Sequence, residues 1–202
     1  MEIRTDRLLL RRWRESDRDR FAEMNADPDV MRHMIDHLSR DESDALIDRV
    51  EEAFNIWGFG LWAVEVPGES DFIGFTGLWP TGFQAPFTPA IEIGWRLNRN
   101  SWGKGYATEA ALAALAFGFE RAELEQIVSF TIPANVRSIA VMERLGMTND
   151  PHDDFDHPGV PSGSPLKRHV LYRIDSEQWG RRGSRSDPQR APRAGPISGH
   201  AG

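Results

Sequence analysis

Three segments in the first half of the chain, residues 61–66, 72–78 and 90–97, are mostly apolar and have the length of strands, and residues 91–97 alternate cleanly between the two faces. A period of two places successive side chains on opposite faces of a sheet, so this pattern predicts three β-strands. The first two segments are joined by Pro67-Gly-Glu-Ser70, a sequence typical of a hairpin turn. We therefore expect these three strands to be antiparallel.

A helical period appears before and after these strands. Ser39 and Glu42 have the spacing of a capping box and open a helix whose apolar stripe ends at Gly58. Ser16 offers an N-cap for a shorter helix that Pro28 stops. The remaining expected elements are a strand at 8–11, an alanine-rich helix ending near residue 121, a strand at 126–132, a helix at 137–145 and a final strand at 166–174. Three antiparallel strands followed by a helix-strand-helix unit indicate a mixed α/β fold rather than a doubly wound one.

Two closely spaced glycines, Gly103 and Gly105, lie between the third strand and the alanine-rich helix. The first N–H groups of a helix lack acceptors and the helix dipole adds positive potential there, so a bare turn at this place attracts anions. Gly-Lys-Gly alone is equally compatible with a plain turn between a strand and a helix. The segment is neither a Walker loop nor a complete dinucleotide fingerprint. If the turn binds a ligand, the chemistry it indicates is phosphate or pyrophosphate held by main-chain amides. The neighbouring sequence must decide between this interpretation and a plain turn.

The segment Trp102-Gly-Lys-Gly105-Tyr-Ala107 resembles the acyl-CoA pyrophosphate loop of the GNAT family of N-acetyltransferases. With Trp in the first place, it is similar to the branch that contains the ribosomal-protein N-terminal acetyltransferases. The further matches to that branch, in the same order, are Thr5-Asp-Arg-Leu-Leu-Leu-Arg-Arg12 with Asn25-Ala-Asp-Pro28, then Glu92-Ile-Gly-Trp95, then Asn135-Val-Arg-Ser138 through Arg144-Leu-Gly-Met147. The resemblance implies one domain over residues 1–179. Its sheet is mostly antiparallel, flanked by helices, and splayed between its fourth and fifth strands, residues 91–97 and 126–132.

The resemblance also implies acetyl-CoA as cosubstrate. Main-chain groups at the end of the fourth strand would bind its pantetheine arm, and the amides of the turn would bind its phosphates. The expected contact residues are Arg96, Leu97, Asn98, Trp102, Gly103, Lys104, Gly105, Tyr106, Ala107, Thr108, Asn135 and Ser138. Two alternatives stay open: Lys104 faces the phosphates or solvent, and Asn135 contacts the arm or caps its own helix.

Glu92 is the candidate general base. An amine acceptor is mostly protonated at neutral pH, so a carboxylate must take up a proton before attack, directly or through water. A structural ion pair with Arg96, on the same face of the strand, is the alternative. We expect Glu92→Gln to slow turnover most at low pH, where neutral amine is scarce. Met142 stands where many family members carry a tyrosine acid, so the candidate donor to the departing thiolate is Ser138, with water as the alternative.

The predicted function is transfer of an acetyl group from acetyl-CoA to a primary amine, by direct attack in a ternary complex. The acceptor is a protein N-terminus or a small amine such as a polyamine, an aminoglycoside or an amino acid. The alternative is a non-catalytic acyl-CoA-binding module that acts as a sensor or scaffold. Glu92 and Ser138 beside an intact loop argue against this alternative.

Composition adds several exclusions. The chain has no cysteine, which excludes disulfides, thiolate metal sites and a cysteine nucleophile. It shows no signal-peptide pattern and no apolar stretch long enough to span a bilayer, so we expect a cytoplasmic enzyme without a membrane partner. The net charge of −7 includes +4 over residues 180–202, which leaves −11 on residues 1–179 and disfavours nucleic acid.

Two segments are expected to lie outside the core. Residues 149–158 contain four aspartates and two histidines, but the prolines and glycines around and after them favour a polar loop over a metal site, and no metal is expected. The loop, through residue 165, is a candidate cover for the acceptor site that could supply carboxylates to a cationic acceptor. Residues 180–202, rich in Arg, Gly, Pro and Ser, are expected to form a disordered tail. The oligomeric state is open, with a homodimer as one alternative.

Overall fold

The computed structural model describes residues 2–35 and 37–186, and it contains the predicted mixture of helices and strands. The strands are β1 (Ile3–Arg4), β2 (Leu9–Arg11), β3 (Leu61–Val66), β4 (Ser70–Pro80), β5 (Ile91–Leu97), β6 (Gln126–Thr131), β7 (Thr148–Asn149), β8 (Phe155–Asp156) and β9 (Arg168–Asp175). The helices are α1 (Asp17–Ala26), α2 (Pro28–Met31), α3 (Arg40–Trp57), α4 (Tyr106–Glu120), α5 (Val136–Arg144) and α6 (Ser176–Ser186), with 3₁₀ turns η1 (Arg99–Ser101) and η2 (Pro151–Asp153). The mixed α/β class predicted from the sequence is confirmed.

The strands form a sheet in the order β1-β2-β3-β4-β5-β6-β9-β7, with β8 paired to β9. The pairing of β5 with β6 is parallel, whereas the neighbouring pairs are antiparallel. Only Ile91 with Ile127 and Glu92 with Val128 are in register between β5 and β6, and beyond them the two strands separate. The predicted splay is therefore confirmed. Strands β5 and β6 are the fourth and fifth strands predicted from the sequence. Their numbers are higher by one because the short strand β1 precedes the first predicted strand.

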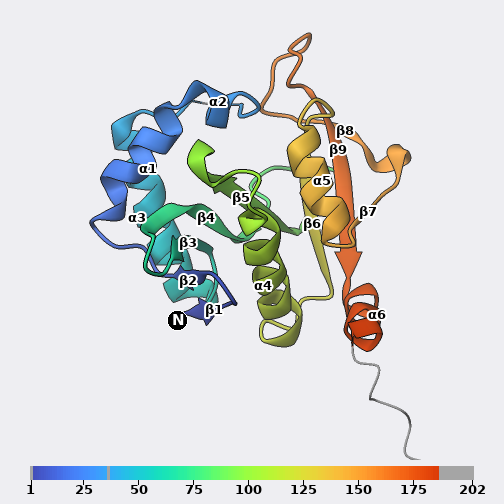
Figure 1. Cartoon of the computed structure of the whole chain (residues 1–202). Coiled ribbons are helices and arrows are strands. Elements are labelled where there is room, and N and C mark those ends of the chain that lie inside the picture. The colour runs from blue at the N-terminus through green and yellow to red at the C-terminus, as the bar shows by residue number, and fades with distance from the viewer. Residues whose placement is uncertain (1, 36, 187–202) are drawn as a thin grey trace, which may run out of the picture.

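Helix α4 packs closely on one face of the sheet. Figure 1 shows α4 and α5 in front of the central strands, and α4 contacts β4 and β5. A Cβ atom at Gly118 would lie 2.7 Å from Cδ1 of Ile127 and 3.0 Å from Cδ1 of Leu78. Close packing is therefore the reason for a glycine inside this helix. It seats α4 so that its N-terminus lies just beyond the end of β5.

The opposite face of β5 meets α1, and a buried group of charges fixes that helix. Arg11 of β2 is 2% exposed and donates to both carboxylate oxygens of Asp17, at 2.7 and 2.9 Å, and to Glu65 at 2.8 Å. Buried charges are tolerated when they are paired and hydrogen-bonded in this way. At the other end of α1, Asn25 accepts a hydrogen bond from Arg96 of β5 at 2.6 Å.

The predicted caps of α3 are confirmed. Ser39 and Glu42 exchange both hydrogen bonds of a capping box, and Gly58 ends the helix with a φ of 74°. Ser16 is the N-cap of α1, but its side chain makes no capping bond. The neighbouring carboxylate of Asp17 accepts from the N–H of Arg14 instead, at 2.7 Å.

The segment predicted as a polar loop, residues 149–165, is more ordered than expected. It completes β7 and contains β8, and both strands pair with β9. Phe155 is 7% exposed and packs with Val128 and Leu171 in a small second core. Val160 of the same segment is 3% exposed, so buried apolar side chains anchor this otherwise polar sequence.

The C-terminal helix corrects the predicted boundary of the tail. The sequence predicts disorder from residue 180, whereas α6 continues to Ser186. Trp179 stacks on Phe119 of α4 with ring centroids 5.7 Å apart, which docks the start of α6. Residues 187–202, the rest of the predicted tail, lie outside the described residues. Within the described part of the chain, none of the helices has the length and apolar character needed to cross a bilayer.

Candidate active site

The gap between β5 and β6 leaves main-chain groups of β5 without strand partners. The N–H of Asn98 donates to the carbonyl of Ile73 at 2.9 Å, and the carbonyl of Gly94 accepts from Oγ1 of Thr76 at 3.0 Å, so both groups face β4. Main-chain groups alternate in direction along a strand, and the N–H groups of Trp95 and Leu97 therefore face the gap. An unpaired strand edge inside a fold favours binding of an extended, amide-bearing ligand.

This geometry corrects two predicted main-chain contacts and adds another. Arg96 has the same orientation in the strand as Gly94 and Asn98, so its main-chain groups face β4 and not the gap. Asn98 cannot offer its N–H to a ligand in the gap, because Ile73 already accepts it. The carbonyl of Leu97 is also occupied, since it accepts from Nε1 of Trp102 at 2.8 Å. Trp95 was missed from the sequence. Only the register with β4 shows which residues of an alternating strand turn their amides away from it.

The turn before α4 leaves its amides uncovered. Gly103 and Gly105 have φ values of 75° and 81°, in the left-handed region that glycine adopts readily. Gly105 is the N-cap of α4 and no side chain caps this helix end. Among the described residues, none accepts a hydrogen bond from the N–H groups of residues 103–108. Six adjacent free donors at a helix N-terminus form a site suited to an anion.

Arg7, which the sequence did not single out, borders this turn. Its guanidinium pairs with Glu109 at 2.6 Å, donates to the carbonyl of Lys104 at 2.9 Å, and lies 4.9 Å from the ring centroid of Tyr106. A Cβ at Gly105 would be 3.3 Å from Nη2 of Arg7. The contact spans about a hundred residues of sequence, so no local pattern could have indicated it.

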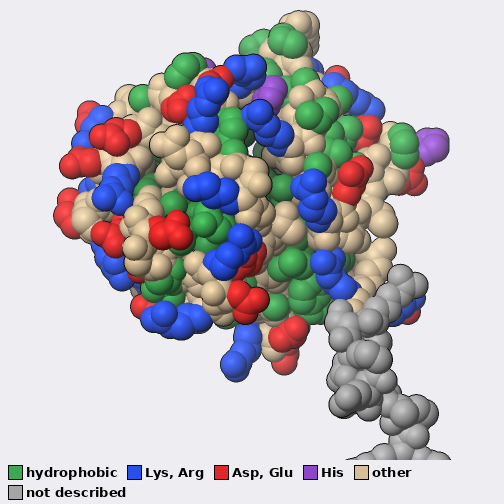
Figure 2. Space-filling view, in the orientation of Figure 1, with side chains coloured by type: hydrophobic (Ala, Val, Ile, Leu, Met, Phe, Trp, Pro, Cys, Tyr) green, Lys and Arg blue, Asp and Glu red, His purple; other side chains and the backbone are tan. Residues whose placement is uncertain are grey.

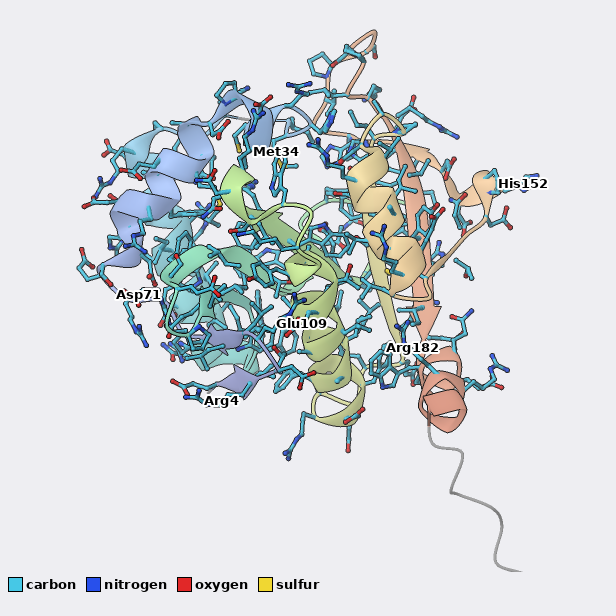
Figure 3. The ribbon with its side chains drawn as sticks, viewed as in Figure 1. Arg4, Met34, Asp71, Glu109, His152 and Arg182 are labelled. Atoms are coloured by element: carbon cyan, nitrogen blue, oxygen red, sulfur yellow. The ribbon has the colours of Figure 1, made fainter. Side chains whose placement is uncertain are left out.

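Glu109 links the N-terminal segment to the first turn of α4, where Figure 3 labels it. It accepts from Oγ1 of Thr5 at 2.6 Å and from the N–H of Arg7 at 3.0 Å. Partial burial alone would raise the pKa of Glu109, but these hydrogen bonds and the charge of Arg7 outweigh it and lower that pKa. Glu109 is therefore an anion that holds Arg7 beside the turn. Lys104 is exposed, with Nζ 5.9 Å from the centroid of Tyr106.

The first turn of α5 lies across the gap from this loop. The guanidinium carbon of Arg137 is 4.6 Å from the ring centroid of Trp102, which brings the two segments together. Asn135 caps α5, accepting from the N–H of Ser138 at 3.3 Å, and donates to Oγ1 of Thr131 at 3.0 Å. The capping alternative for Asn135 is therefore realised. The hydroxyl of Ser138 has no hydrogen-bond partner among the described residues.

The surface over these segments is positively charged. Figure 2 shows Lys and Arg side chains gathered over α4 and α5, around a hollow in the middle of this face. The exposed cations of this region include Arg7, Lys104, Arg137 and Arg144. The body of the protein is acidic overall, so the local positive potential is a property of this face and suits a phosphate-bearing ligand.

Glu92 and Arg96 do not form the structural ion pair that was the alternative interpretation. Within the described chain, neither side chain lies within 4.0 Å of an opposite charge. Burial without a cationic partner raises the pKa of Glu92 to about 8. This corrects the expectation for Glu92→Gln: the carboxylate is depleted at low pH, so its contribution as a base is largest above pH 8.

The acidic segment around η2 does not join this site. Asp150 accepts from His152, Asp153 pairs with Arg173 at 2.9 Å, and Asp154 accepts from Asn149 at 2.9 Å. Figure 3 shows His152 at the edge of the molecule, away from α4. In the described ranges, no group of three or more His, Asp or Glu side chains is arranged to hold a metal ion.

The chain is similar in sequence and fold to known acetyltransferases. A family model described as the acetyltransferase (GNAT) domain matches residues 7–148. The uncharacterized N-acetyltransferase YnaD of Bacillus subtilis is 29% identical over 179 residues, 89% of this chain and 99% of YnaD. A GNAT-family acetyltransferase of Bacillus anthracis has a TM-score of 0.72 at 28% identity, covering 88% of this chain and 99% of that chain. RimL, a ribosomal-protein alpha-N-acetyltransferase solved with coenzyme A, shares the fold with a TM-score of 0.70 at 15% identity, covering 88% of this chain and 99% of that chain.

Proposed function

Because the chain belongs to the GNAT family of acetyltransferases and is an acyl-CoA N-acyltransferase, we propose that it transfers an acetyl group from acetyl-CoA to a primary amine by direct attack. The observation that carries the proposal is the pair of open main-chain surfaces. One is the set of free amides at residues 103–108, and the other is the unpaired edge of β5.

The residues around the gap fit acetyl-CoA. The amides of Gly103 through Thr108 would hold its phosphates, with Arg7 and Lys104 adding positive charge. The N–H groups of Trp95 and Leu97 would bind the pantetheine amides and polarise the thioester carbonyl. Binding in this way satisfies donors that the fold leaves unpaired.

The proton balance assigns roles to two side chains. The ammonium form of the acceptor gives a proton to Glu92, and the free amine then attacks the thioester carbonyl carbon. The new C–N bond forms, the nitrogen loses a second proton, and the C–S bond breaks to release a thiolate. Ser138 would relay the second proton, accepting it from nitrogen and donating its own hydroxyl proton to the thiolate, and the first proton leaves Glu92 to solvent. A base with a pKa of about 8 suits this step near neutral pH.

The acceptor class is a protein N-terminus or a small amine. The fold shared with RimL, which acts on a ribosomal protein, supports the first class. Glu92 is half-buried and desolvation raises its pKa, which favours an acceptor narrow enough to enter the gap.

A thiol-release assay with acetyl-CoA and a panel of primary amines and peptides tests the proposal, with acetyl-CoA affinity measured in parallel by calorimetry. We expect thiol release that depends on the amine, and a product heavier by one acetyl group. Acetyl-CoA binding without release by any amine would contradict the proposal. It would favour the alternative of a non-catalytic acyl-CoA sensor.

A further inference from the structure

The face of β5 that carries Glu92 has an open space at its centre. Glu92, Gly94 and Arg96 follow one another on this face, because alternate residues of a strand share a side. A Cβ built at Gly94 would have one neighbour within 4 Å, Oε1 of Glu92 at 3.9 Å. Along this face, the carboxyl group of Glu92, the open space over Gly94 and the guanidinium of Arg96 follow one another, at the point where β5 begins to separate from β6.

Arg96 is half-buried, and within the described residues no carboxylate pairs with it. Its Nη1 donates to Asn25 at 2.6 Å, its Nη2 lies 3.2 Å from Sδ of Met34, and its guanidinium carbon is 5.4 Å from the ring centroid of Phe75. Its Nε is buried and has no hydrogen-bond partner within the described residues. Burial lowers the pKa of Arg96 to about 10. A buried guanidinium is costly unless an anion pairs with it.

Arg11 shows how this fold treats a buried arginine that has only a structural role. It lies between the carboxylates of Asp17 and Glu65, at 2.7 and 2.8 Å. Both arginines come from strands and both contact α1. Arg96 therefore lacks the counter-charge that the same protein supplies to Arg11.

The guanidinium of Arg96 is nevertheless held in place. Asn25 is 1% exposed and donates to Oγ of Ser43 at 2.9 Å, and Ser43 donates to the carbonyl of Ser39 at 2.8 Å. This chain of hydrogen bonds reaches from the start of α3 to Arg96. An arginine oriented by neutral groups keeps donors available for a planar anion such as a carboxylate.

Positive charges act on His33, the chain neighbour of the Met34 that contacts Arg96, although Arg32 also pairs with Asp29. Burial lowers the pKa of His33, and the positive charges of Arg32 and Arg137 lower it further. Arg137 belongs to α5, so positive charge reaches His33 from across the gap as well as from its own segment. An anionic group on a ligand would be attracted to this side of the site.

We infer that the acceptor is a small amine that also carries a carboxylate, which Arg96 binds while the amine lies over Gly94 beside Glu92. The inference rests on the proposed acetyl transfer. In that reaction the amine nitrogen gains the acetyl group, the C–S bond breaks and the carboxylate is unchanged. The acceptor class is thus amino-acid-like, and polyamines and simple alkylamines lack the group that Arg96 recognises.

Matched amine pairs test this inference by steady-state kinetics. Each pair shares a skeleton with and without the carboxylate: glycylglycine and its amide, lysine and cadaverine, 4-aminobutyrate and butylamine. We expect kcat/KM to be about 10-fold to 100-fold higher for the carboxylate member of at least one pair, since hydrogen bonds to charged groups are the strong ones. Preference for the member without the carboxylate in every pair would overturn the inference.

Two variants assign the preference to Arg96. Arg96→Gln should abolish it, mainly through the KM for the amine. Asn25→Asp gives Arg96 an internal carboxylate without removing its packing, and it should also weaken the preference, even where Arg96→Gln does not fold. Arg40→Gln, which removes an exposed arginine paired with Asp19 and Asp44, is the matched control and should keep the preference.

The outcomes separate this inference from the function on which it rests. If no amine is acetylated, the proposed function itself fails. If amines and peptides are acetylated with the same efficiency whether or not they carry a carboxylate, the function stands and the inference is wrong. A carboxylate preference that persists in both Arg96→Gln and Asn25→Asp would assign recognition to another residue and also overturn it.

Discussion

The turn before α4 and the acidic segment around η2 are opposites in sequence and in structure. The turn, Trp102-Gly-Lys-Gly105, has a single ionisable side chain, yet together with the first three residues of α4 it leaves six adjacent amides without acceptors among the described residues. Residues 149–158 contain four aspartates and two histidines, and the aspartates of this segment bond to neighbours such as Arg173 and Asn149. The candidate site does not lie where Asp and His residues are most frequent in the sequence. It lies where the fold leaves main-chain polar groups unpaired among the described residues.

The largest effect is expected at the turn. Gly105→Glu places a side chain and a negative charge where the phosphates would lie, and we expect acetyl-CoA affinity to fall at least about 100-fold, because several hydrogen bonds to a charged group are lost. Gly68→Glu is the matched control, since Gly68 has the same φ of 81° in the β3-β4 hairpin. Both variants carry similar backbone strain, and calorimetric titration should show loss of binding in the first alone. Equal affinities in the two variants would remove the turn from the binding site.

An intermediate effect is expected at Glu92, which joins no ion pair with any of the residues that the structure describes. Glu92→Gln should lower kcat/KM about 100-fold above pH 8, the low end for loss of a general base. The pKa of about 8 keeps the wild-type carboxylate protonated at lower pH, so the two proteins should converge as pH falls. Profiles of kcat/KM against pH check this. A constant ratio across the range would assign Glu92 to a structural role.

The same substitution has a consequence for stability that can be measured separately. The folded-state pKa of Glu92 is raised from 4.5 to about 8, so its stabilising contribution is complete below pH 4.5 and is lost as pH rises through 8. Gln cannot ionise and avoids that loss. Glu92→Gln should therefore melt at a higher temperature than wild type at pH 9 and at nearly the same temperature near pH 4.5. Melting curves that differ equally at both pH values would mean that Glu92 is not desolvated in solution.

The smallest effect is expected in the acidic segment. Asp153→Asn removes one exposed ion pair with Arg173, and such pairs contribute little in water. We expect kcat/KM to change less than about twofold and the melting temperature by no more than about 2 °C. Addition of a divalent cation should alter neither. A large loss of activity would show that this segment belongs to the site, against the comparison drawn above.

Much of the site region could be predicted because its signals are local. The capping box of Ser39 and Glu42 and the glycine pair before α4 each lie within a few residues of sequence. The splay of β5 from β6 was predicted by resemblance to the family, and the register of the strands confirms it. The contacts of acetyl-CoA and the roles of Glu92 and Ser138 stay predictions.

The sequence by itself determined where an anion-binding turn can form, because φ preferences and free helix amides depend on adjacent residues. Tertiary structure decided which polar groups stay unpaired. Arg7 reaches Glu109 across 102 positions, and Arg96 reaches Asn25 across 71. It also decided that Glu92 is buried without a cation, which sets its pKa. Pairing and desolvation depend on residues distant in the chain, so no local pattern contains them.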